Sequence, residues 1–247
     1  MNFLSTLQRQ SASGLISPGL ISGSILLGAF SLVPLRAQGD PDAAIVSRID
    51  TSVHAREQGL LGYTVTEHYA VFRNHDEQHP VAEMMVRSTY QKDAGKNYNI
   101  VSETGSALMR KVLEAILDNE KRMSVPANRV TAVISPANYD MTVKGSETVD
   151  GRNCLQLSIK PKRMSQYLLN GTVWVDAQDG SIVQLLGVTA KSPSVFAGAS
   201  QVLRQYTTID GFPMATHAKA VSNSWLVGQT IIKIDYTNYQ IQLVASK

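Results

Sequence analysis

The run from His75 to His79 (His-Asp-Glu-Gln-His) is the part of the sequence that most resembles a metal site. Two histidines four residues apart share one face of a helix and bind zinc well in that setting. Here the run belongs to a polar segment, 74–80, which ends in Pro80 and separates two β-rich stretches, so it predicts a hairpin turn. In a turn this spacing does not bring the two rings together. We therefore expect a solvated polar turn, with metal binding as the less favoured alternative.

Nucleophilic catalysis finds little support in the sequence. A serine hydrolase needs a serine on a strained elbow and a histidine within its reach, and no G-x-S-x-G motif occurs in residues 38–247. His54 falls in an expected helix, whereas His68 and His217 fall in expected strands. Half-buried imidazoles are ordinary at such positions. An unrecognised secreted hydrolase is therefore the least favoured of three functional hypotheses.

The acidic and thiol groups have simple structural explanations. Asp176, Asp179 and Asp210 lie near expected turns, where aspartate binds the local backbone, although paired acids for glycoside chemistry remain an alternative. Cys154 is the only cysteine, so no internal disulfide can form, and we expect nothing nearby to lower the pKa of its thiol enough to make it a nucleophile. We expect it in the core. The sequence thus predicts no catalytic residue, no metal and no cofactor.

The amino-terminal segment, residues 1–37, has the pattern of a secretory signal peptide. It contains Arg9 but no acidic residue, continues into a long apolar run, and offers Ala37 as a cleavage position. An uncleaved membrane anchor is the alternative. Residues 38–247 then form one expected domain, exported to the periplasm. Without Arg9 and Arg36 this domain is close to neutral, which argues against a nucleic-acid partner.

Hydrophobic periodicity predicts a mainly β, α+β domain with a curved antiparallel sheet. The pattern is organised around the hairpin 171–188, in which Asp179-Gly180 supplies the positive φ of a tight turn. Alternation in this hairpin points Val173 and Val175 to one face and Trp174 to the other. The expected helices are 41–57 and 105–123, and the expected strands are 62–73, 81–91, 96–103, 139–149, 152–160, 166–176, 181–190, 202–209, 214–222 and 225–236.

The motifs of this hairpin and of a later turn resemble those of a known family. They are Gly171-Thr-Val-Trp-Val-Asp176, Asp179-Gly-Ser-Ile-Val183 with Gly187, and Tyr206 followed by Asp210-Gly-Phe-Pro213. In this respect the chain is similar to the outer-membrane lipoprotein-sorting, LolA-like proteins of the LolA, LolB and LppX type, a lipid-binding family. The resemblance implies that residues 38–247 form a LolA-like half-barrel domain, an incomplete antiparallel β-barrel with helices covering the concave face.

The resemblance also implies a function without catalysis. Such proteins bind lipid or lipoprotein acyl chains in a periplasmic cavity, in some cases for transfer to the outer membrane, and inner- or outer-membrane proteins are further partners. A lid-fastening arginine of the family would fall on Arg87 or Arg204, the strand candidates. The alternative to a carrier is an envelope sensor or interaction module on the same fold, which would bind a protein partner through an exposed apolar patch.

Strand alternation and the helix stripe predict which side chains line the acyl-chain cavity. The alternative is that the same side chains fill a dry core. Two methionines on the apolar side of helix 105–123 would suit a movable lid or ordinary packing equally well. The predicted lining residues are Met84, Val86, Tyr98, Ile100, Leu113, Ile116, Leu155, Leu157, Ile159, Val173, Val175, Ile232 and Ile234.

Overall fold

The computed structural model describes residues 41–192, 198–224 and 228–243. These residues form three helices and ten strands. Along the chain the elements are α1 (Pro41–Gly59), β1 (Leu60–Arg73), β2 (Ala82–Gln91), β3 (Gly95–Gly105), α2 (Ala107–Ser124), α3 (Pro126–Arg129), β4 (Tyr139–Val149), β5 (Arg152–Pro161), β6 (Leu169–Asp176), β7 (Ile182–Thr189), β8 (Gln201–Ile209), β9 (Phe212–Ser224) and β10 (Gly228–Leu243).

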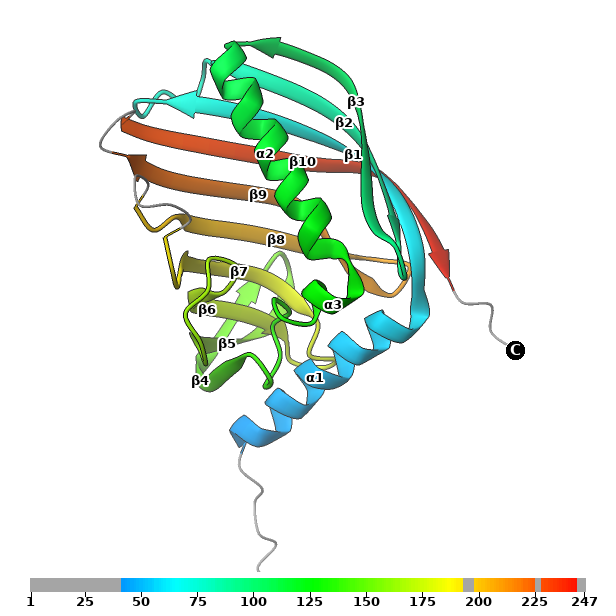
Figure 1. Ribbon diagram of the computed structural model, residues 1–247. Coiled ribbons are helices and arrows are strands. Elements are labelled where there is room, and N and C mark those ends of the chain that lie inside the picture. Colours follow the sequence, from blue (N-terminus) through cyan, green and yellow to red (C-terminus); the bar gives the residue numbers. More distant parts are fainter. Residues whose placement is uncertain (1–40, 193–197, 225–227, 244–247) are drawn as a thin grey trace, which may run out of the picture. The chain divides into compact units, whose positions relative to one another are not determined.

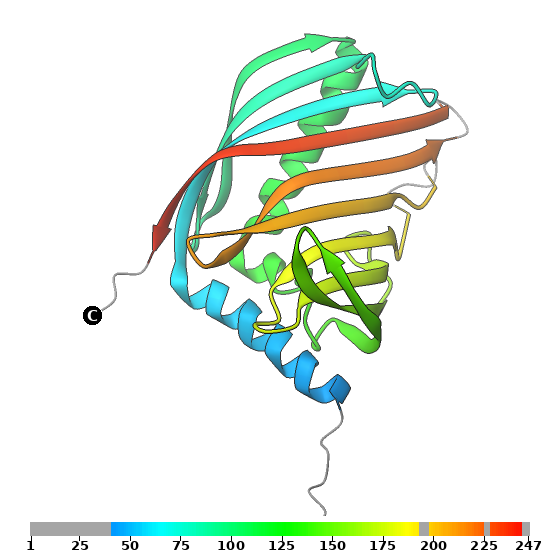
Figure 2. The same ribbon diagram turned by 180° about the vertical axis from the view of Figure 1, so that it is seen from behind.

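All ten strands belong to one antiparallel sheet with the order β3-β2-β1-β10-β9-β8-β7-β6-β5-β4. Neighbours in the sheet are neighbours in the chain, except that β1 pairs with β10. Figure 1 shows the sheet curving around α2, while α1 lies across the end formed by β4–β7. From behind, the strands pass in front of α2, whereas α1 runs below them and stays visible (Figure 2). The sheet is therefore an open half-barrel whose two edges are β3 and β4, and the predicted mainly β, α+β fold class is confirmed.

Three Asp-Gly pairs form the expected hairpin turns. Gly151, Gly180 and Gly211 have φ values of 75°, 72° and 84°, in the left-handed region that glycine enters without a steric penalty. The turn at Gly180 has a second role, because a Cβ there would lie 2.6 Å from the backbone carbon of Arg48 in α1. The Arg48 guanidinium also donates a hydrogen bond to the Ala177 carbonyl. This hairpin therefore holds α1 against the sheet.

Two separate hydrophobic cores lie on the concave side of the sheet. In the first core, Leu113 and Leu117 of α2 pack on β1, β2 and β10, where Tyr69 is fully buried. In the second core, Ile45 and Ile49 of α1 pack on β4–β7. Each helix covers only its own part of the sheet, so the two cores do not merge into one.

The convex face carries two smaller apolar clusters. Cys154, Trp174 and Val183 form one of them, and the Trp174 indole donates a 2.8 Å hydrogen bond to Glu147. Val173 and Val175, by contrast, are buried in the second concave core. The predicted alternation of this strand is thus confirmed.

The expected helices and strands agree with the observed ones to within a few residues, apart from two additions. The short helix α3 follows α2 where the sequence predicted only a helix end, and β10 continues to Leu243 instead of stopping at Tyr236. Ser106 precedes α2, but its side chain makes no capping hydrogen bond. The signal peptide expected over 1–37 lies outside the described residues, as does most of the segment 193–200.

Among the described helices, none combines the length and apolar character needed to cross a membrane.

Candidate functional site

A cavity of about 520 Å³ lies on the concave face between the two cores. Residues from α1, the ends of α2 and α3, the segments that follow them, and strands β7–β10 contribute to its wall. The apolar part of the wall includes Leu185 of β7, Val202 of β8 and Met214 of β9. Six of the lining residues are tyrosines, namely Tyr63, Tyr139, Tyr167, Tyr206, Tyr236 and Tyr239. The wall is thus mostly apolar and aromatic, with polar groups at defined positions.

The residues predicted to line a cavity lie elsewhere on the concave side or at its edge. None of them is among the residues that line the 520 Å³ space. Ile100 is 41% exposed on the edge strand β3. The others pack in or against one of the two cores: Met84, Val86, Tyr98, Leu113, Ile116, Ile232 and Ile234 in the first, and Leu155, Leu157, Ile159, Val173 and Val175 in the second.

The physical reason is that alternation assigns a side chain to a face of the sheet but does not show what covers that face. Where α1 and α2 reach the sheet, their apolar side chains fill the space above it, for example Leu113 above the first core. Between the two helices, around Arg204 and Tyr206 of β8, the space remains open. The cavity is therefore set by where the helices end.

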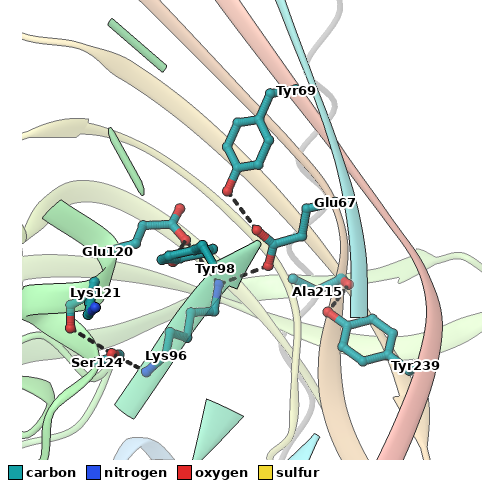
Figure 3. A network of polar contacts seen from close by, with 9 residues as sticks. All are labelled: Glu67, Tyr69, Lys96, Tyr98, Glu120, Lys121, Ser124, Ala215 and Tyr239. Carbon is teal, nitrogen blue, oxygen red and sulfur yellow. Dashed lines mark hydrogen bonds and ion pairs between the residues drawn. The ribbon is translucent and has the colours of Figure 1, made fainter. Parts of the chain in front are cut away.

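A polar network joins α2 to the sheet at the wall of this cavity (Figure 3). The Lys96 ammonium on β3 lies 3.0 Å from Glu67 on β1 and 3.0 Å from Glu120 on α2. The Tyr69 hydroxyl donates to Glu67 at 2.7 Å, and the Tyr98 hydroxyl donates to Glu120 at 3.0 Å. Glu67 is fully buried, and each of its carboxylate oxygens has a partner. Both carboxylates are thus satisfied by the same cation and by neighbouring phenols.

Burial and charge act in opposite directions on this network. Burial lowers the pKa of Lys96, but the Glu120 carboxylate and other nearby groups outweigh it and hold that pKa well above its ordinary range. For Glu120, burial raises the pKa, but the positive charges of Lys96 and Arg204 lower it by more than burial raises it, so the net shift is downward. Both groups are consequently charged at neutral pH, and the helix is held by an ion pair.

A second ion pair connects α1 to α3. The Arg129 guanidinium donates to both oxygens of Glu57, at 2.8 and 2.9 Å. This forked geometry is the strongest that arginine and a carboxylate can form. The Glu57 pKa is lowered mainly by the hydrogen bond from Arg129, against the effect of burial. Both residues line the cavity, so this pair fixes the wall where the two helices meet.

The two strand arginines occupy different surroundings. Arg87 is exposed on β2, and it is not part of the cavity wall. Arg204 lines the cavity from β8 and lies in phase with Val202 and Tyr206 on the concave face. Within the described residues Arg204 makes no ion pair; its guanidinium donates a hydrogen bond to the Tyr206 hydroxyl, and the residue keeps solvent exposure.

The sequence contains a sign of these polar residues of the cavity wall, because two of them are charged residues at positions of a strand that otherwise carry apolar side chains. Glu67 is in phase with Val65 and Tyr69 on β1, and Arg204 is in phase with Val202 on β8. Burying a charged residue on an apolar face costs free energy, so such a residue usually has a partner of opposite charge or a function. The distant partners, Lys96 and Glu120, could not be recognised because they come from other elements.

The groups considered for catalysis do not assemble in the described part of the chain. No cluster of three metal-ligating side chains occurs there. His79 contacts Asp76 at 3.0 Å within the exposed turn, where His75 has a positive φ. Burial raises the pKa of the Cys154 thiol. The geometry of the cavity therefore suits binding of an amphiphilic molecule by burial and hydrogen bonding.

No protein-family model matches this chain, and no curated protein matches it. Among solved structures, the chain is similar to a DUF1329 family protein from Desulfovibrio piger (14% identity, 84% of this chain and 95% of that chain covered, TM-score 0.41). It is also similar to a LolA superfamily protein from Nitrosomonas europaea (11% identity, 83% and 94% covered, TM-score 0.41). A third similar structure is an outer membrane lipoprotein-sorting protein domain from Vibrio parahaemolyticus (10% identity, 81% and 92% covered, TM-score 0.43). Two of these names, LolA superfamily and outer membrane lipoprotein-sorting protein, are those of the family expected from the hairpin motifs, and nothing about a ligand follows from this likeness.

Proposed function

We propose that this chain is a non-catalytic periplasmic carrier, which binds lipid or lipoprotein acyl chains for transfer toward the outer membrane. The observation that supports the proposal is the 520 Å³ cavity between the two cores. Its volume falls within the range of about 300–1,000 Å³ that is usual for sites of small ligands. Leu185, Val202 and Met214 contribute to the apolar part of its wall; Val202 is half-buried and the other two are buried.

Burial alone provides the affinity for an acyl chain. Each methylene group that leaves water contributes about 0.8 kcal/mol, so a chain of several methylenes is bound without any reactive side chain. The tyrosines of the wall suit the same ligand, because each presents an aromatic ring to apolar groups and a hydroxyl to polar ones. The Tyr239 hydroxyl, for instance, donates to the Ala215 carbonyl at 2.8 Å, which fixes its ring in the wall.

The proposal is tested by a pair of neighbouring substitutions on β8. Val202 faces the cavity, whereas Leu203 points to the other face of the strand, and both are half-buried. Val202→Trp fills part of the cavity, and Leu203→Trp adds the same ring outside it. We expect wild type and Leu203→Trp to carry a stoichiometric lipid after purification, measured by extraction and mass spectrometry, and to take up a fluorescent fatty acid in vitro. Val202→Trp should lose both properties while remaining folded.

Two results would contradict the carrier. One is a wild-type protein that carries no lipid and takes up no acyl chain. The other is equal uptake by Val202→Trp and Leu203→Trp, which would place the ligand outside this cavity. A polypeptide that copurifies in place of a lipid would favour the interaction module instead.

A further inference from the structure

The charges in the cavity wall are not balanced. Four basic and two acidic residues line it, although residues 38–247 as a whole are close to neutral. Glu57 is taken up by Arg129, and Glu120 by Lys96. Lys96 also pairs with the buried Glu67 directly behind the wall, so one cation serves two carboxylates. With Glu67 included, four basic and three acidic residues leave one excess positive charge at the cavity.

Two basic lining residues, Arg56 and Arg204, take part in none of these ion pairs, and Arg204 is the one on strand β8 beside the apolar wall. It lies on β8, where its strand neighbours on the concave face, Val202 and Tyr206, line the cavity on either side. Arg204 pairs across the sheet with Leu185 of β7, which is itself an apolar lining residue. The guanidinium thus borders the same space that would receive an acyl chain.

The surroundings of Arg204 keep it charged. Burial lowers its pKa, but the phenols of Tyr206 and Tyr236 and the Glu120 carboxylate raise the pKa above its ordinary range. Glu120 acts on Arg204 through its charge and not through an ion pair, and its Oε2 atom is bound by Lys96 and Tyr98. A guanidinium in such a position has forked donors that match a carboxylate or a phosphate, and both phenols lie beside it.

We propose that the cavity binds an anionic amphiphile, whose carboxylate or phosphate head group binds Arg204 while its acyl chain lies against Leu185, Val202 and Met214. This inference rests on the proposed function and adds the class of ligand. A bound anion offsets the excess positive charge of the wall, whereas a neutral lipid leaves the guanidinium with the uncharged Tyr206 hydroxyl as its hydrogen-bond partner. The head group thereby fixes the orientation of the chain, which burial of methylene groups alone does not.

The test uses three ligands with the same chain, namely hexadecanoate, hexadecyl phosphate and hexadecanol. Their affinities are measured by displacement of Nile red, a neutral probe, from the folded protein of residues 38–247 after extraction of bound lipid. Wild type should bind both anions at least about tenfold more tightly than the alcohol, since hydrogen bonds to charged groups have about this effect. This comparison requires no variant.

Variants then assign the effect to one side chain. Arg204→Gln should weaken binding of both anions at least about tenfold and leave hexadecanol within about twofold. Arg204→Lys keeps the charge without the forked donors, so its affinities for the two anions should lie between those of wild type and Arg204→Gln. Arg87→Gln is the matched control, because Arg87 is exposed on β2 outside the cavity. Its three affinities should equal those of wild type.

The outcomes separate this inference from the proposed function. Equal wild-type affinity for hexadecanol and hexadecanoate, or equal weakening of all three ligands in Arg204→Gln, would overturn the role of Arg204 and leave the carrier intact. Absence of binding for every ligand would overturn both. Inorganic phosphate distinguishes the two sources of the anion: we expect no displacement of hexadecyl phosphate by millimolar phosphate, whereas displacement that disappears in Arg204→Gln would assign the site to the free anion.

Discussion

The Lys96→Met substitution tests whether the buried ion pair holds α2 on the sheet. The Lys96 ammonium lies 3.0 Å from carboxylate oxygens of both Glu67 and Glu120. Glu67 has no solvent exposure and Lys96 only 12% at the side chain. Methionine keeps most of the aliphatic stem but removes the charge, so two carboxylates are left in the protein interior without their shared cation.

The expected loss follows from the cost of an uncompensated buried charge. Removing one partner of a buried ion pair destabilises a protein by about 3–5 kcal/mol, and solvent screening reduces this little at such low exposure. For a domain of this size each kcal/mol lowers the Tm by about 2–4 °C, so the variant should melt roughly 6–20 °C below wild type at neutral pH. Wild-type and variant stability are compared by urea unfolding.

The pH dependence supplies an independent check. In wild type, Lys96 lowers the pKa of Glu120 in the folded protein, and the variant loses this effect. A lowered carboxyl pKa stabilises the folded state above the ordinary value of 4.5, and this stabilisation is lost as pH falls through the folded pKa. The difference in stability between wild type and variant should therefore shrink as pH falls below 4.5. Adding Glu67→Gln to the variant should restore part of the stability at neutral pH.

The control is Lys111→Met, a substitution at an exposed position of α2. It should change the free energy of unfolding by less than about 0.5 kcal/mol. A loss below about 1 kcal/mol for Lys96→Met, similar to that of the control, would show that the pair contributes no more than a surface ion pair. The anchoring role of Lys96 would then be refuted.

Three further predictions concern the turns, the thiol and acid stability. Gly180→Ala should destabilise the protein more than Gly151→Ala in urea unfolding, because both glycines have positive φ but only a Cβ at 180 meets the backbone of α1; equal losses would rule out that contact. Cys154 should react with an aromatic disulfide reagent only after unfolding, since it is fully buried and its thiol pKa is raised, and rapid reaction of the native protein would contradict its place in the core. Pairing with Arg129 lowers the pKa of Glu57 in the folded protein, so the pair stabilises the protein above pH 4.5, the ordinary pKa, and this stabilisation is lost as pH falls through the folded pKa. Glu57→Gln should therefore make the stability of the protein fall less steeply in acid. An unchanged dependence of stability on pH would argue against the pair.

Local signals in the sequence were enough to place most elements. The Asp-Gly pairs at 150, 179 and 210 mark hairpins because their backbone conformation is a property of a few adjacent residues. Helix 105–123 could be predicted because its apolar stripe follows from the spacing of its own residues and does not depend on the strands against which it packs. Strand alternation also assigned Val173 and Trp174 to opposite faces of β6, as observed.

The cavity could not be predicted in this way, because it depends on distant parts of the chain. Its wall combines α1, α2 and strands β7–β10, and its limits are set by where the two helices stop covering the sheet. The side chains with the clearest apolar periodicity are those that pack most completely. They therefore fill the cores, whereas the residues around the open space, such as Arg204 and Tyr206, belong to strands with mixed patterns.

The pairing of β1 with β10 has a consequence for the order in which the sheet can form. Strands β1–β3 and strands β4–β9 each consist of sequential hairpins, which need only short loops to close. The two groups meet only through β10, whose partner β1 lies near the opposite end of the described chain. Closing so long a loop is entropically unfavourable, and a high contact order slows folding. We therefore expect two independently forming blocks whose union waits for β10, so that the space between the two cores, and any ligand site within it, comes into existence at the last step of folding.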